Sequence, residues 1–171
     1  ASAFSTFPNN GVRYDTSSFT KVVDKQGNVI LENKPKEHKV LDEGVAWIMA
    51  DMLSSVVNSA AANYAQISGV FVGGKTGTTD DAFDDWFNGF TPTYSASLWI
   101  GSDYGISLSD HSIIATYMWG NIMRNINKVY DGSRAARPAN VISYNGEYYI
   151  NGTQSGAKSV SDLKSREVEI C

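Results

Sequence analysis

The chain of 171 residues lacks three features that would place it in common classes. Its only cysteine is Cys171, the last residue, so no disulfide can form within the chain and the thiol has no catalytic setting. No segment approaches the roughly 20 consecutive apolar residues that span a bilayer. Basic residues number 14 against 18 acidic ones, and a net charge of −4 argues against nucleic acid as a partner.

Apolar residues nevertheless make up 42% of the chain, enough for a sizeable core. The length fits one domain or a large piece of one. Residues 1–7 resemble the last turns of a helix entered in mid-element, which indicates a fragment. The β-rich runs 19–23 and 29–32 are joined by turn residues and predict a hairpin.

Two helices are predicted from apolar residues spaced three and four apart. The first covers residues 42–59, and the carboxylate of Asp42 is expected to cap its N-terminus. The second covers residues 112–127. The buried faces are expected to hold Val45, Ile48, Met49, Met52, Leu53, Val56 and Val57 in the first helix and Ile114, Tyr117, Met118, Ile122 and Ile126 in the second. Trp86, Trp99 and Trp119 are also expected in the core.

Three strands are predicted over residues 69–78, 84–91 and 95–102. Parallel neighbours need a crossover of about a dozen residues or more, and the links here are far shorter. The strands are therefore expected to form an antiparallel meander. The fold class expected is α+β, with an antiparallel sheet flanked by helices.

The composition changes near residue 129. Residues 129–171 are rich in Ser, Gly and Asn, and within them residues 141–150 predict a hairpin that turns at Asn145 and Gly146. We expect residues 1–128 to be the C-terminal portion of an incomplete domain and residues 129–171 to be a polar extension or linker.

The most unusual stretch is residues 73–79, in which glycines flank one lysine and three threonines at the end of an apolar strand. Glycines let another backbone approach closely. The ammonium of Lys75, the hydroxyls and the backbone N–H groups together suit an anionic ligand such as a carboxylate or phosphate.

Residues 69–76 (GVFVGGKT) also satisfy the P-loop pattern G-x-x-x-x-G-K-[ST]. A P-loop wraps phosphate with a loop and continues into a helix. Here Val70-Phe71-Val72 favours a strand, and the residues after Lys75 open a helix poorly. A strand is therefore the preferred interpretation.

The sequence resembles class A (bifunctional) penicillin-binding proteins in the C-terminal half of their transpeptidase domain. The resemblance is strongest in residues 75–81 (KTGTTDD), 84–92 (DDWFNGFTP) and 98–103 (LWIGSD). Residues 6–11 (TFPNNG), 23–30 (VDKQGNVI) and 46–53 (AWIMADML) resemble segments that precede these in the family. The resemblance, with its segments in the same order as in the family, implies a fold like that of penicillin-binding proteins and serine β-lactamases.

The resemblance implies a role for each residue of the K-T-G strand. Lys75 would supply positive potential and bond a serine of an upstream S-x-N motif. The hydroxyls of Thr76 and Thr78 would hold a carboxylate, and the backbone N–H of Thr78 would be half of the oxyanion hole. Gly77 would keep the strand edge clear for substrate. Thr79 and Trp86 are further substrate-binding candidates.

The family nucleophile, a serine in S-x-x-K, is expected to be absent from this chain because it lies upstream of K-T-G. Matches to the motif at Ser18/Lys21, Ser155/Lys158 and Ser161/Lys164, and to S-x-N at Ser143-Tyr144-Asn145, are interpreted as chance. The chain alone is expected to be inactive and to need a complementary N-terminal fragment that carries S-x-x-K and S-x-N.

The function expected is that of a D,D-transpeptidase, which cross-links peptidoglycan stem peptides through a serine acyl-enzyme and is trapped by β-lactams. A D,D-carboxypeptidase or β-lactamase-like hydrolase of the same fold is one alternative, and a non-catalytic β-lactam- or peptidoglycan-binding module is another. No cofactor or metal is expected. The resemblance implies the bacterial cell envelope, at the outer face of the plasma membrane, with an anchor and a glycosyltransferase domain upstream.

Overall fold

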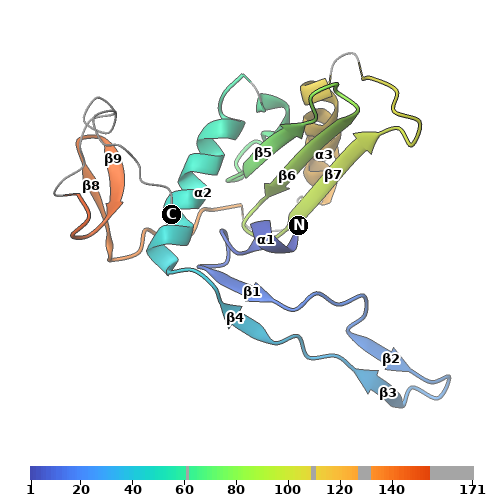
Figure 1. The fold of residues 1–171 in the computed structure, drawn as a ribbon. Coiled ribbons are helices and arrows are strands. Elements are labelled where there is room, and N and C mark those ends of the chain that lie inside the picture. The colour runs from blue at the N-terminus through green and yellow to red at the C-terminus, as the bar shows by residue number, and fades with distance from the viewer. Residues whose placement is uncertain (61, 109–110, 127–131, 155–171) are drawn as a thin grey trace, which may run out of the picture.

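The computed structural model describes residues 1–60, 62–108, 111–126 and 132–154 (Figure 1). Its helices are α1 (Ser2–Ser5), α2 (Glu43–Val57) and α3 (His111–Ile126), with a 3-10 helix η1 (Asn63–Ala65). Its strands are β1 (Val12–Tyr14), β2 (Lys21–Val23), β3 (Val29–Glu32), β4 (Glu37–Lys39), β5 (Gly73–Thr78), β6 (Asp84–Phe90), β7 (Ser95–Gly101), β8 (Val141–Tyr144) and β9 (Glu147–Ile150).

The main sheet has the order β5-β6-β7, with both pairs antiparallel, so the meander expected from the short links is confirmed. Side chains alternate between its faces. Phe87 and Leu98 point to the face that α3 covers, where they pack with Trp119. α2 lies along β5 (Figure 1). The α+β architecture is therefore confirmed.

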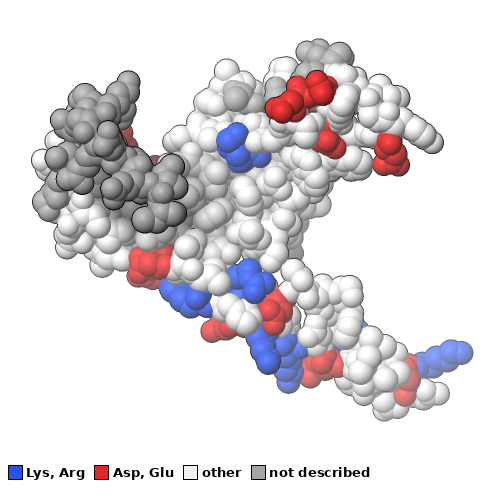
Figure 2. All heavy atoms as spheres, viewed as in Figure 1, with Lys and Arg blue, Asp and Glu red and all other residues white. Residues whose placement is uncertain are grey.

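A two-stranded arm projects from this body (Figure 1). β1 pairs with β4 at its base, and β2 pairs with β3 at its tip, both antiparallel. The tip is the hairpin predicted over residues 19–32. Basic and acidic side chains alternate along the arm in Figure 2, and every residue of β2 and β3 is exposed.

The first predicted strand begins later than expected, at Gly73 rather than residue 69. Ile67 and Val70 form an isolated bridge around Gly69, whose φ of +74° is the left-handed conformation that glycine adopts freely. The N–H of Phe71 then donates to the carbonyl of Gly132 rather than to a strand. The tight turn and the tertiary hydrogen bond thus occupy residues 69–71, which were predicted to be in the strand.

The helix boundaries are confirmed within two residues, and Asp42 caps α2 by accepting from the N–H groups of Gly44 and Val45. The buried faces, however, are largely wrong. α2 buries Ala46, Trp47, Ala50, Leu53 and Val57, and α3 buries Ala115, Thr116, Trp119, Gly120 and Met123.

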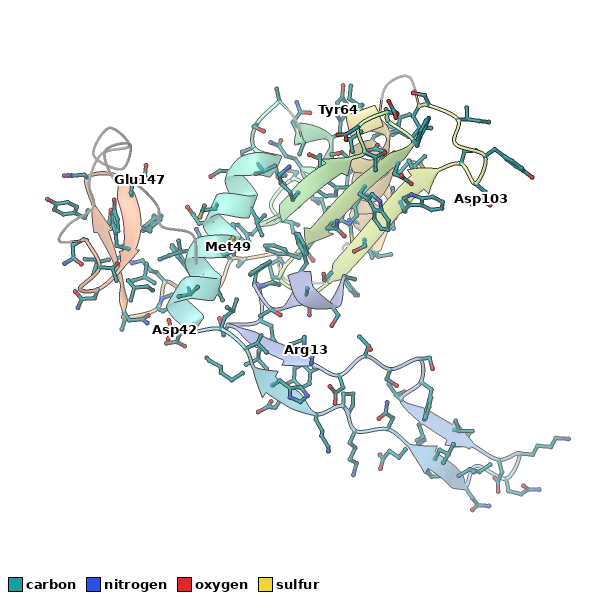
Figure 3. All side chains as sticks on the ribbon, viewed as in Figure 1. Arg13, Asp42, Met49, Tyr64, Asp103 and Glu147 are labelled. Carbon is teal, nitrogen blue, oxygen red and sulfur yellow. The ribbon has the colours of Figure 1, made fainter. Side chains whose placement is uncertain are left out.

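The reason is that small residues let a helix approach a sheet closely, and Ala46 and Ala50 follow the same helical spacing as the bulky residues. The bulky methionines of α2 face away from the main sheet. Met49, labelled in Figure 3, lies on the side of α2 toward β8 and β9, and Met52 is 59% exposed. On α3, Tyr117 is likewise exposed.

The three tryptophans that were predicted to be core residues lie on opposite sides of the main sheet. Trp119 is 1% exposed and lies in the core as predicted. Trp86 and Trp99 are 40% and 46% exposed, so the prediction that they are core residues is wrong. Both point to the sheet face opposite α3, because they alternate with the buried Phe87 and with Leu98.

The described part of the tail contacts α2. The hairpin predicted over residues 141–150 is present as β8 and β9, with Asn145 and Gly146 in the turn at positive φ. Trp47 packs edge-on against Tyr148, and the side-chain amide of Asn140 donates to Asp42. Within the described residues, no helix is long and apolar enough to cross a bilayer.

Candidate functional site

The K-T-G residues form β5, a strand at one edge of the main sheet. Among the described residues, β6 is its only strand partner, so its other edge is unpaired along Lys75 to Thr78. Lys75 and Thr78 are exposed, whereas Thr76 and Gly77 are half-buried. An extended ligand can therefore reach the backbone of this strand.

The direction of the Thr78 N–H follows from its neighbour. The N–H of Thr79 donates to the carbonyl of Asp84 on β6. Successive N–H groups along a strand point to opposite edges. The N–H groups of Thr78 and Thr76 therefore point away from β6, toward the unpaired edge, where an incoming oxygen could accept them.

The ammonium of Lys75 bends toward the same strand. Its Nζ donates to the carbonyl of Thr76 at 3.0 Å and lies 3.3 Å from the Oγ1 of Thr76. No described carboxylate forms an ion pair with Lys75. A cation and a hydroxyl thus converge, and the charge of Lys75 is left uncompensated within the described part of the chain.

An exposed aromatic row continues the site across the sheet. Gly77 lies opposite Trp86, which lies opposite Trp99, and the two indole rings are 6.3 Å apart at 40°. The Nε1 of Trp99 donates to Asp84, which fixes that ring. The sequence did not place Trp99 in this row, because its alternation with Ala and Leu residues is typical of any half-buried strand.

Thr79, the last of the three threonines, is engaged within the chain. Its hydroxyl oxygen accepts the N–H of Asp84 at 3.0 Å and lies 3.3 Å from the Asp84 carboxylate. Acidic side chains gather at this end of the sheet in Figure 2, where β5 turns into β6 and β7 leads into the loop toward α3. They include Asp80, Asp81, Asp84 and Asp103.

Asp85 has a role that the sequence did not suggest. It lies in β6, is fully buried and accepts the N–H of Ala115 at 2.9 Å. It therefore fastens α3 to the back of the sheet. Among the described residues, no three His, Cys, Asp or Glu side chains gather to hold a metal ion.

Two of the chance matches to the nucleophile motifs fall on described residues, and neither lies on β5. Ser18 is exposed in the arm, and Ser143 is exposed on β8. Ser155/Lys158 and Ser161/Lys164 lie outside the described residues. The P-loop alternative is wrong, because β5 is followed by a turn and β6 rather than by a helix.

Comparison with known proteins identifies the family. The sequence model described as "Penicillin binding protein transpeptidase domain" matches residues 1–102, more than half of the chain. Penicillin-binding protein 1A of Clostridium acetobutylicum is 37% identical over 96% of this chain and 20% of its own length. Penicillin-binding protein 1A of Aquifex aeolicus is 36% identical over 75% of this chain and 18% of its own length. The chain thus spans about a fifth of these relatives.

Solved structures agree on the fold. The crystal structure of penicillin-binding protein 1A from Haemophilus influenzae has a TM-score of 0.75 at 18% identity, covering 89% of this chain and 31% of that chain. The penicillin-binding protein PonA1 from Mycobacterium tuberculosis has a TM-score of 0.65 at 21% identity, covering 84% of this chain and 44% of that chain. The chain belongs to the penicillin-binding protein transpeptidase family, in the class A group that its K-T-G segment resembles.

Proposed function

We propose that this chain supplies the K-T-G wall of a D,D-transpeptidase that cross-links peptidoglycan stem peptides. The observation that carries the proposal is the unpaired edge of β5. There the outward N–H of Thr78 lies close in sequence to the converging Lys75 ammonium and Thr76 hydroxyl. A hydrogen-bond donor for a developing oxyanion and a clamp for a carboxylate are thus present on one strand.

In the proposed reaction, a serine from a complementary segment attacks the carbonyl carbon of the penultimate D-alanine. The C–O bond forms, the amide C–N bond breaks, and the terminal D-alanine leaves with the proton that the serine hydroxyl gives up. The amine of a second stem peptide then attacks the ester carbonyl: a new amide C–N bond forms, the ester C–O bond breaks, and the proton that the amine loses goes to the serine oxygen. The N–H of Thr78 would stabilise the oxyanion in both steps, worth about 3–4 kcal/mol.

The hydroxyls of Thr76 and Thr78 would hold the terminal carboxylate of the donor peptide or of a β-lactam, in the positive potential of Lys75. Charge-assisted hydrogen bonds of this kind are about twice as strong as neutral ones. Lys75 would also bond the serine of an S-x-N motif. Gly77 would leave room for the substrate backbone, with Thr79 and Trp86 bordering it.

The partner proposed is an N-terminal fragment that carries S-x-x-K and S-x-N. Two surfaces of the described part could receive it. β7 has an unpaired edge, and apolar side chains are exposed on α3. Those on α3 are Ile113, Tyr117, Met118, Ile122 and Ile126. Without the fragment, the chain should bind weakly and catalyse nothing.

By the same resemblance, we propose residues 1–128 as the C-terminal portion of the transpeptidase domain and residues 129–171 as an extension. The complete protein would act at the outer face of the bacterial plasma membrane, held by an upstream anchor and joined to a glycosyltransferase domain.

Release of D-alanine by the assembled domain tests the proposal. Assembly of the chain with its complementary fragment should release D-alanine from a stem pentapeptide and form cross-linked dimers. Lys75→Ala should lower the rate at least about 100-fold, whereas Lys25→Ala, at the exposed tip of the arm, should leave it unchanged.

The two alternatives predict different products. Release of D-alanine without cross-linking would indicate a carboxypeptidase. Binding of penicillin with no release from any stem peptide would indicate a non-catalytic module. Either result would contradict the transpeptidase assignment.

A further inference from the structure

Arg134 lies between two aromatic rings from different elements. Its guanidinium carbon is 3.4 Å from the centre of the Trp47 ring on α2 and 4.9 Å from the centre of the Phe71 ring. A planar guanidinium over an aromatic face is attracted by the ring's negative face and packs against it. The side chain is only 24% exposed, so water competes little for these contacts.

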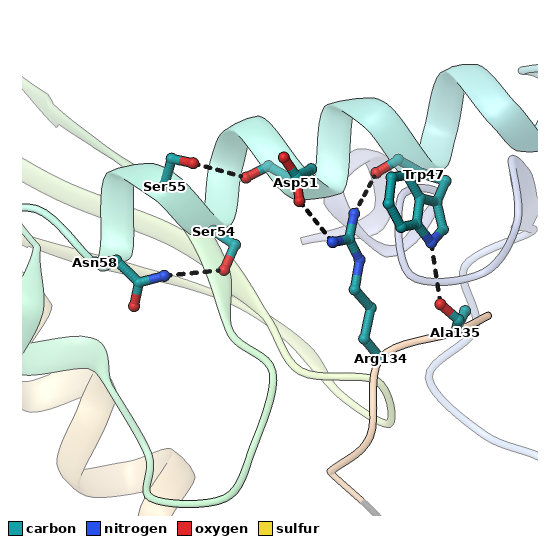
Figure 4. Close-up of polar contacts among 7 residues, drawn as sticks. All are labelled: Trp47, Asp51, Ser54, Ser55, Asn58, Arg134 and Ala135. Carbon is teal, nitrogen blue, oxygen red and sulfur yellow. Dashed lines mark hydrogen bonds and ion pairs between the residues drawn. The ribbon is translucent and has the colours of Figure 1, made fainter. Parts of the chain in front are cut away.

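Hydrogen bonds fix the same side chain in place (Figure 4). Nη1 donates to Oδ1 of Asp51 at 2.5 Å, and Nη2 donates to the carbonyl of Trp47 at 3.1 Å. The indole of Trp47 donates in return to the carbonyl of Ala135 at 3.0 Å. Arg134 and its neighbour thus join the segment after α3 to the middle of α2.

The segment also holds the chain that leads into β5. The N–H of Phe71 donates to the carbonyl of Gly132 at 2.7 Å, two residues before the strand begins. The ring of Phe71 packs against Phe90 on β6, at 6.4 Å between centres. Phe71 is thus held by one hydrogen bond and two ring contacts, four residues before Lys75.

We propose that Arg134 is a positioning residue for the K-T-G strand. By stacking on Trp47 and Phe71 together, it fastens the start of β5 to α2 and so fixes the outward N–H of Thr78 where acylation needs it. The proposal rests on the proposed function, because positioning has a catalytic consequence only if this strand is an active-site wall.

Lysine could not replace arginine here. It would keep the charge opposite Asp51 but lose the planar group that stacks on both rings, together with the second donor that reaches the carbonyl of Trp47. Arg137, in the same segment, is exposed and has no hydrogen bond or ion pair within the described residues, so it offers a matched control.

The test compares Arg134→Lys with Arg137→Lys in the domain assembled from this chain and its complementary fragment. Hydrogen exchange is followed at the amides of Phe71 and β5, and penicillin acylation is separated into its binding constant and its rate constant. Arg134→Lys should raise exchange at Phe71 about tenfold and lower the acylation rate constant, with little change in the binding constant. Arg137→Lys should change neither.

Three results would overturn the proposal: unchanged exchange at Phe71, faster exchange in every strand alike, or faster local exchange with an unchanged acylation rate. If Arg134→Lys does not fold, Asp51→Asn replaces it. Asp51→Asn removes the charge and keeps an acceptor, and the same local changes are expected. If the wild-type assembly is not acylated, the proposed function fails. Exchange at the Phe71 amide still tests whether Arg134 holds the start of β5.

Discussion

Two glycines of β5 should respond in opposite ways to the same substitution. A Cβ on Gly74 would lie 2.4 Å from Cζ of Phe87 and 2.9 Å from the backbone oxygen of Asn88. A Cβ on Gly77 would meet only the Cβ of Trp86, at 3.5 Å, which is ordinary contact. The packing of the described chain therefore requires glycine at 74 and not at 77.

The expected magnitudes follow from these distances. Gly74→Ala should lower the free energy of unfolding by about 1–3 kcal/mol, because a rigid ring and a backbone oxygen must move. Gly77→Ala should change it by less than about 1 kcal/mol, since alanine also loses less conformational entropy than glycine on folding. At this chain length each kcal/mol corresponds to a shift of about 2–4 °C in Tm.

Acylation should show the reverse order. The methyl group of Gly77→Ala would project beside Trp86 on the face that carries Lys75, and displacing a substrate by about 1 Å can cost about 100-fold in rate. Thermal unfolding and fluorescent-penicillin acylation, both on the assembled domain, measure the two effects. Wild-type acylation by Gly77→Ala would show that residue 77 does not need to be glycine for substrate access, and a stability loss equal to that of Gly74→Ala would show that packing requires glycine there.

Three further predictions concern other contacts. Trp86→Ala should lower stability by about 1–2 kcal/mol, since the residue is 40% exposed and its ring packs against Trp99, and should weaken binding of a stem peptide in a fluorescence titration; unchanged binding would remove Trp86 from the site. Asp85→Ala should cost about 1–3 kcal/mol in urea unfolding, because the buried N–H of Ala115 loses its acceptor; an unshifted midpoint would contradict this anchor. Hydrogen bonds from the Asn140 side chain and then from backbone N–H groups hold the pKa of Asp42 below its usual 3.8, so the cap should persist above pH 3.8 and fail as the pH falls through the lowered pKa. Protection of the amides in the first turn of α2, measured as the exchange rate relative to the intrinsic rate at each pH, would show this. Protection that stays constant down to acid pH would argue against the cap.

Local signals predicted the elements of this fold well. The carboxylate of Asp42 precedes an apolar periodic run, and the cap is observed. Asn145 and Gly146 can adopt positive φ, and the hairpin turns there. The short links excluded parallel strands, so the antiparallel meander followed. Each of these inferences depends on chain geometry within a few residues.

Tertiary contacts decided what the local pattern could not. Ala46 and Met49 both satisfy helical spacing, and only the proximity of β5 selects the small residue for the core. No local pattern indicated the role of Asp85, because its partner, Ala115, lies 30 positions away. No sequence pattern indicated a role for Arg134, because the two rings that it contacts, Trp47 and Phe71, lie on α2 and just before β5.

We propose that this chain forms one wall of a penicillin-reactive site whose nucleophile lies on another segment. Mixing the chain with its complementary N-terminal fragment, adding fluorescent penicillin and separating the two polypeptides under denaturing conditions shows which of them carries the reactive serine. The label should appear on the N-terminal fragment, and only when this chain is present. Label on this chain, or on the fragment equally well without it, would contradict the claim.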